Sequence, residues 1–261
     1  FNNTALGRNS LYYNTTGDEN TSSGNESLQA NTTGNNNTAL GNYALQANTT
    51  ASNNTAVGYQ AGYTNTTGSA ITAIGQNALR SSTTASNNVA VGQDSLYTLT
   101  TGTGNAVLGT AAARGMTTGN YNTVMGQEAL KDNTTASENT AVGYNSSRYS
   151  TTGANNVSVG FRSLYNNTTA GSNTAVGHET GYTNTTSQFN AFFGRQAGYY
   201  ATGGANTFIG QQAGVVVTSG GGNTILGRFN GNQGGLDIRT GNNHIVLSDG
   251  DGNPQLYFAS G

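Results

Sequence analysis

The residues that could perform acid–base chemistry are few in this 261-residue chain, and they are scattered along it. Glycoside hydrolysis needs two carboxyl groups held on either side of the scissile bond. The acidic residues show no such pairing at a recurring place in the sequence: Asp18, Glu19, Glu26, Asp94, Glu128, Asp132, Glu138, Glu179, Asp237, Asp249 and Asp251. We interpret them as solvated surface charges, and a carboxylate pair formed across neighbouring segments is the open alternative.

Metal chemistry is equally poorly supported. Neither His178 nor His244 has a cluster of further metal ligands near it in the sequence. The segment DGDGNP (249–254) resembles the first half of a calcium loop, but Pro254 replaces the required glycine and Ser260 the closing glutamate. We therefore interpret it as a turn, and we expect no metal site and no cofactor. The absence of cysteine excludes disulfides and thiolate sites.

Tyrosine is the residue most suited to binding, and its spacing is regular. An aromatic ring can pack on a sugar ring while its hydroxyl group forms hydrogen bonds. Separations that are multiples of 17 residues link six tyrosines, which alternate with Arg80, Arg114 and Arg148. These six are the candidate glycan-binding residues, although they could instead only shield the protein wall: Tyr12, Tyr63, Tyr97, Tyr165, Tyr182 and Tyr199.

The same 17-residue interval governs the whole chain. Glycine recurs at this spacing from Gly7 to Gly194, and Gly210 and Gly227 follow after 16 and 17 residues. The approximate consensus sequence of the repeat is N-T-A-V-G-x-x-A-L-Y-x-N-T-T-G-x-N. We number these positions 1 to 17, so that residues 54–70 are one repeat and the glycine is position 5. Triplets such as Asn65-Thr66-Thr67 match the glycosylation acceptor pattern, but their fixed place in the repeat favours a structural turn.

A repeat of 17 residues predicts an all-β fold. It is too short for the common paired-helix repeats, and Thr, Asn and Gly disfavour helices. These residues suit short strands and turns, so each repeat is expected to form one coil of a parallel β-solenoid, about 4.8 Å above the last. We expect the solenoid to cover residues 1–227 and a non-repeat capping segment to cover 228–261. Within this segment, the sequence of 244–260 predicts two strands around a turn.

Strand alternation gives each coil an inner and an outer face. Position 4 is nearly always large and apolar, as in Val57 and Ile74, and is expected to point inward. Position 3 then points outward, and its small side chains beside the glycine row suggest close packing of another backbone. The expected oligomer interface consists of Ala39, Ala56, Ala73, Ala90, Phe192 and Phe208. A monomer whose outer face contacts no partner is the alternative.

Position 9 of the repeat is often leucine. Where glycine replaces it, as in Gly198-Tyr199, the tyrosine ring is expected to fill the gap.

Composition excludes several classes of function. The chain is 33% hydrophobic and 8% charged, which favours a thin core repeated many times over one thick core. Its formal net charge is −2 and Lys131 is the only lysine, so it lacks the basic patch that nucleic-acid binding needs. The longest aliphatic run is 215–217, far too short for membrane insertion. No secretory signal is visible.

The repeat units NTALG (37–41), NTAVG (54–58) and ITAIG (71–75) resemble those in the heads of trimeric autotransporter adhesins. They are also similar to repeat regions of phage tail-fibre-like proteins that carry an endosialidase-type intramolecular chaperone. The segment GNQGGLDIRTGNNHIVLSDGDGNPQLYF (231–258) strengthens the second resemblance. The adhesin heads are trimers of left-handed parallel β-rolls with a shorter period. The resemblance implies a left-handed, β-roll-like coil in a homotrimeric, surface-displayed fibre.

Together these observations predict a non-enzymatic structural and adhesive fibre module on a virion tail or a cell surface, outside the cell. The expected partner is the chain itself, as a homotrimer, with weak multivalent binding of host surface glycans. Three alternatives remain open at this point: a polysaccharide-degrading tailspike, a self-assembling extracellular filament subunit, and an ice-binding solenoid.

Overall fold

A computed structural model describes residues 2–259 of the chain. These residues form two compact units, one ending at Ala136 and the other beginning at Ser137, and each unit is described by itself. The described residues contain strands and turns but no helix, so no helix among them could cross a membrane. The fold is a β-solenoid, as the repeat predicts.

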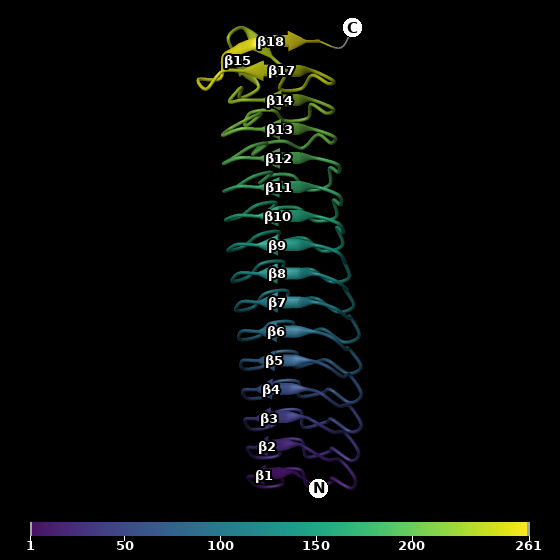
Figure 1. The fold of residues 1–261 in the computed structure, drawn as a ribbon. Coiled ribbons are helices and arrows are strands. Elements are labelled where there is room, and N and C mark those ends of the chain that lie inside the picture. The colour runs from purple at the N-terminus through teal and green to yellow at the C-terminus, as the bar shows by residue number, and fades with distance from the viewer. Residues whose placement is uncertain (1, 260–261) are drawn as a thin grey trace. The chain divides into compact units, whose positions relative to one another are not determined.

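The first unit is a stack of eight short parallel strands (Figure 1). Each strand takes positions 2 to 4 of one repeat, and neighbouring strands pair in register, for example Thr38 with Thr55 and Thr55 with Thr72. One repeat is therefore one coil. The strands are β1 (Thr4–Leu6), β2 (Thr21–Ser23), β3 (Thr38–Leu40), β4 (Thr55–Val57), β5 (Thr72–Ile74), β6 (Val89–Val91), β7 (Ala106–Leu108) and β8 (Thr123–Met125).

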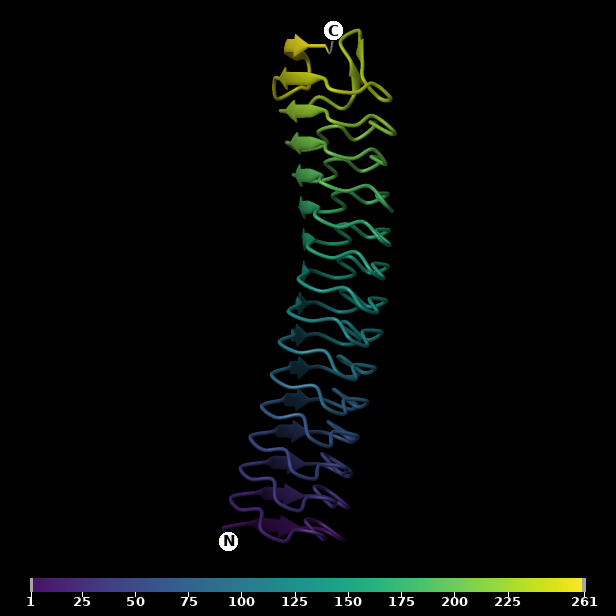
Figure 2. The same ribbon diagram turned by 90° about the vertical axis from the view of Figure 1, so that its right-hand side faces the viewer.

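The second unit has coils of the same geometry and a different C-terminal end (Figure 2). Parallel strands are β9 (Thr140–Val142), β10 (Val157–Val159), β11 (Thr174–Val176), β12 (Ala191–Phe193), β13 (Thr207–Ile209), β14 (Thr224–Leu226) and β17 (Ile245–Ser248). A small antiparallel hairpin, β15 (Asn232–Gln233) and β16 (Leu236–Asp237), lies in the connection before β17. The last strand, β18 (Pro254–Phe258), pairs antiparallel with β17. The two strands expected within 244–260 are thus present.

The glycine at position 5 is required by the next coil of the same chain. Gly58 has a φ of +130°, and a Cβ atom placed on it would lie only 2.7 Å from the carbonyl carbon and oxygen of Gly75. Side chains rarely adopt this backbone conformation. The close backbone neighbour that the small residues suggested is therefore the adjacent coil, with no need for a second copy.

The inner and outer faces of the strands are opposite to those expected from the sequence. Position 3 is fully buried, as in Ala56 and Ala73, whereas Ile74 at position 4 is 39% exposed. The assignment of position 4 to the core is therefore wrong. The expected oligomer interface is wrong for the same reason, because all six of its side chains are enclosed by their own coils: Ala39, Ala56, Ala73, Ala90, Phe192 and Phe208.

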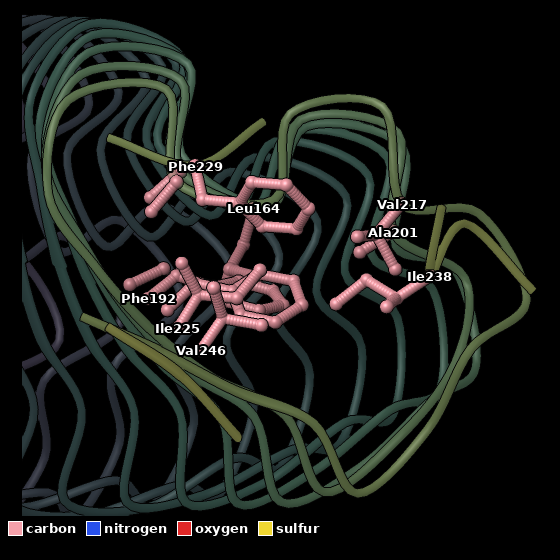
Figure 3. Packing of buried hydrophobic residues seen from close by; sticks show 12 residues of the cluster. Leu164, Phe192, Ala201, Val217, Ile225, Phe229, Ile238 and Val246 are labelled. Atoms are coloured by element: carbon pink, nitrogen blue, oxygen red, sulfur yellow. The ribbon is translucent and has the colours of Figure 1, made fainter. Parts of the chain in front are cut away.

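Volume complementarity across the coil explains this arrangement. Position 9 leucines such as Leu45 and Leu79 are also fully buried, so in these coils a small residue at position 3 and a large residue at position 9 share a thin core. Where position 9 is Gly198, a Cβ atom there would lie 2.8 Å from ring carbons of Phe192. The expectation that Tyr199 fills this gap is thus wrong, because Phe192 fills it from position 3. Figure 3 shows Phe192 among the buried side chains of this core.

Columns of amide and hydroxyl side chains bond each coil to its neighbours. Asn37 at position 1 accepts a hydrogen bond from the backbone N–H of Asn54 and donates to the carbonyl of Ala51, at 3.0 and 2.9 Å. Asn48 at position 12 is buried and donates to Asn31 at 2.9 Å. Thr66 at position 13 donates its hydroxyl to the next coil. The buried Asn-x-Thr turns therefore have a structural role, because their amide and hydroxyl groups bond one coil to the next.

Candidate interaction surface

The side chains that could bind a metal or act in catalysis are not brought together in the described residues. No set of three or more His, Asp or Glu side chains between residues 2 and 259 could hold a metal ion. His178 is exposed and lies 3.6 Å from the Glu179 carboxylate. His244 lies directly before β17 in the second unit, and its Nδ1 atom is 2.9 Å from the hydroxyl group of Tyr257 in β18. Neither histidine has the partners that nucleophilic or metal chemistry requires.

The acidic turn between β17 and β18 is closed by its own hydrogen bonds. Asp249 accepts from the backbone N–H groups of Asn253 at 2.8 Å and Asp251 at 3.0 Å. Its other oxygen accepts from the side-chain amides of Asn253 and Gln255. The backbone hydrogen bond from Asn253 is the main reason that the pKa of Asp249 lies below its ordinary value. These contacts support the interpretation of DGDGNP as a turn.

In the first unit, tyrosines and arginines at position 10 form an alternating column. The Arg80 guanidinium lies over the Tyr63 ring at 5.4 Å and over the Tyr97 ring at 5.6 Å. Arg114 lies at 5.2 Å from the Tyr97 ring centre, so a cation lies near this ring on two neighbouring coils. Cation–π attraction between neighbouring coils therefore stabilises this side of the solenoid.

In the second unit, the same position carries three tyrosines in succession. Tyr165 and Tyr182 stack at 5.1 Å with planes 9° apart, and Tyr182 and Tyr199 stack at 4.8 Å with planes 1° apart. A hydrogen bond with Tyr149 is the main cause that lowers the pKa of Tyr165, whereas burial raises the pKa of Tyr199. The stack is a packed column within the wall of the coil.

This stacking limits how the candidate tyrosines could bind glycans. The faces of the Tyr182 ring are occupied by Tyr165 and Tyr199, so a sugar could reach only its edge and its hydroxyl group. Tyr97 is similarly placed between two arginines. Tyr12 differs, because it is 64% exposed and touches Tyr13 edge-on. The six tyrosines thus all occupy position 10 of the repeat, but neighbouring side chains cover the ring faces of most of them and prevent stacking on sugars.

A different surface is the most distinctive feature of both units. Side chains at position 4 form a row of large apolar groups on the outside of the strands, which we call the outer row. In the first unit it consists of Leu6, Leu40, Val57, Ile74, Val91, Leu108 and Met125, with Ser23 in β2. In the second unit it consists of Val142, Val159, Val176, Phe193, Ile209, Leu226 and Leu247. Contiguous exposed apolar surface of this kind marks interaction sites.

Position 6 borders the outer row, and three of its side chains in the second unit form an aromatic stack. Tyr144 and Phe161 lie 5.6 Å apart, and Phe161 and His178 lie 4.9 Å apart, both pairs with planes 16° apart. The Arg162 guanidinium lies over the Phe161 ring at 5.0 Å. No enclosed pocket occurs in the described residues.

Sequence reasoning missed the outer row because it placed these residues in the core. A usable signal was present in the sequence. Position 3 becomes large at Phe192 and Phe208 where position 9 becomes glycine, at Gly198 and Gly214. Such an exchange of volume occurs between residues that share one interior. It identifies position 3 as the inner face and leaves position 4 for the outside.

Comparison with known proteins adds no further identification: no protein family, no curated protein and no solved structure matches this chain.

Proposed function

We propose that the chain is a structural and adhesive fibre module, displayed on a virion tail or a cell surface, in which three copies associate along their outer rows. One observation carries the proposal: a row of apolar side chains, interrupted by Ser23 in the first unit, lies on the outer strand face of each unit, with its valines half-buried and its larger residues exposed. Placing these side chains against a partner removes apolar surface from water, which contributes about 25 cal/mol per Å².

A second copy of the chain is the partner that fits best, because the outer row is periodic. Its side chains recur once per coil, and adjacent strands of a sheet are about 4.8 Å apart. A partner that follows the row over many coils must offer apolar groups at the same rise. Another copy in the same orientation offers that rise, and the row itself contains no charged residue that would repel it.

The regular hydrogen bonding between coils supports the mechanical part of the proposal. Each coil is bonded to the next by strand pairing, by asparagine columns and by threonine hydroxyls. Weak glycan contacts, repeated on several copies, would gain strength through avidity. These contacts would use tyrosine hydroxyl groups and ring edges, and retention of the chain on an array of surface glycans tests this part.

The mass of the particle in solution tests the assembly. We expect three times the 26.6 kDa of one chain by light scattering. The variant Ile74→Glu places a charge in the outer row and should give monomers, whereas Thr84→Glu places the same charge in an exposed turn of the same coil and should leave the trimer intact. A monomeric wild-type chain, or an Ile74→Glu variant that keeps the native mass, contradicts the proposal.

A further inference from the structure

A repeating contact surface leaves the alignment of two copies poorly defined. In the second unit, position 4 is apolar in every strand from β9 to β14, and position 2 is Thr, Val or Ala. Two copies displaced by one coil would therefore bring nearly the same residue types together. Strand surfaces without a distinctive pattern specify their register weakly. If copies associate along the outer row, another feature must define which coils lie opposite each other.

The last two strands of the second unit provide such a feature. At β17 the outward residue at position 2 becomes Ile245, while Leu247 continues the outer row in register with Leu226. β18 adds a second layer, because Phe258 pairs with Ile245 and Leu256 with Leu247. Residues directly opposite in an antiparallel pair lie on the same face.

These four side chains form an exposed apolar surface that is two residues wide, which we call the C-terminal patch. Ile245 is 45% exposed, Phe258 54% and Leu256 46%. Val246, between Ile245 and Leu247, is fully buried, so the patch is on the outside of the strands and the core is on the other side. Position 2 carries no other residue as large as Ile245 in the strands from β9 to β14. The patch is therefore a non-repeating end to a repeating row.

We propose that the C-terminal patch contacts the same patch of other copies and sets the register of the assembly, so that each coil lies beside the identical coil of its partners. This inference rests on the proposed function. A displacement of one coil leaves the repeating contacts almost unchanged, but it separates the patches and returns their large apolar side chains to water. Because the patch continues the outer row on the same face, a parallel copy that covers the row also covers the patch.

The absence of cysteine in the chain allows a direct test. Thr207→Cys and Ala191→Cys place single thiols at position 2 of adjacent coils, whose strands pair at these residues. The two variants are mixed, one of them labelled with ¹⁵N, and disulfides are formed by mild oxidation. In an assembly with one register, links between identical sites should exceed links between the two different sites by at least tenfold, as measured by mass spectrometry.

Substitutions then distinguish the patch from the repeating row. The variant Ile245→Thr/Leu256→Thr/Phe258→Ser should still associate, but the ratio of same-site to different-site links should fall towards one. Ile245→Thr alone, which introduces the usual position 2 residue, should lower the ratio partly. The matched control Val142→Thr/Val159→Thr/Val176→Thr replaces three methyl groups of the repeating row by hydroxyl groups. It should weaken association without changing the ratio of same-site to different-site links.

The outcomes separate this inference from the proposed function. A monomeric wild-type chain overturns the proposed assembly, and the inference with it. An associated wild-type chain with equal numbers of same-site and different-site links overturns only the inference. The inference is likewise overturned if the triple patch variant associates and keeps the wild-type ratio.

Discussion

Phe192 and Gly198 share one space in the core, and this predicts a strong dependence between their substitutions. Phe192 is fully buried and stacks on Phe208 at 5.3 Å. A Cβ atom on Gly198 would lie 2.8 Å from Phe192 ring carbons. In other coils the same two positions carry alanine and leucine, as in Ala73 and Leu79. Exchanging the large and small residues between the two positions should therefore restore a normal coil.

The magnitudes follow from the volume at this site. Phe192→Ala leaves a void and should destabilise the second unit by about 3–5 kcal/mol. Gly198→Leu alone overpacks the coil against the ring and should cost about 1–3 kcal/mol. Its backbone φ of +60° is no obstacle, because Leu164 has a φ of 48° at the equivalent position. The double variant conserves volume and should cost less than about 1.5 kcal/mol.

Guanidinium unfolding of the four chains gives the four free energies and their coupling. If the effects were independent, the double variant would lose about 4–8 kcal/mol, the sum of the single losses. Gly181 also faces the Phe192 ring, at 3.0 Å from a Cβ atom to Cδ2, so Gly181→Leu should recover further stability in the double variant. Additive losses would show that the two positions do not share a space, and would refute the volume argument.

Two further predictions concern the glycine row and the terminal turn. Gly58→Ala should destabilise the first unit by about 2 kcal/mol or more, because its φ is +130° and its Cβ atom would meet the backbone of Gly75; thermal unfolding measures this, and an unchanged midpoint would contradict the strain. The pKa of Asp249 is below its ordinary value of 3.8, so its contribution to the turn is complete above that pH and is lost as the pH falls through the lowered pKa. Faster hydrogen exchange of the Asn253 amide below pH 3.8, corrected for intrinsic rates, should follow this loss in the wild-type chain, and the correction should leave no pH dependence in Asp249→Asn.

The sequence was sufficient to predict the coil but not its orientation. The glycine spacing and the strand-forming residues at positions 2 to 4 predicted one coil per repeat, and the pairing of Thr38 with Thr55 confirms it. Alternation alone could not decide which face is inside, since both Ala56 and Val57 are apolar. Residue size then gave the wrong answer, because the interior beside position 3 is already filled by leucine at position 9.

The candidate binding residues were located only partly for a related reason. The spacing placed Tyr165, Tyr182 and Tyr199 on one side of successive coils, and the structure shows them there. A coil rise of about 4.8 Å brings rings at the same position of successive coils within stacking distance, so their faces are lost to ligands. Spacing in the sequence does not reveal this loss. The C-terminal patch was missed because the pairing of β17 with β18 aligns residues that are distant in the sequence.

The asparagine columns have a consequence for how this molecule can change in length. Amides at position 1 bond within their own coil and to the neighbouring coil, as Asn105 does with Gly119 and Asn88. A deletion or duplication of one whole repeat inside either unit therefore joins bonding partners of the same kind. Recombination between similar repeats can therefore lengthen or shorten the stack in steps of about 4.8 Å while the asparagine bonding is kept.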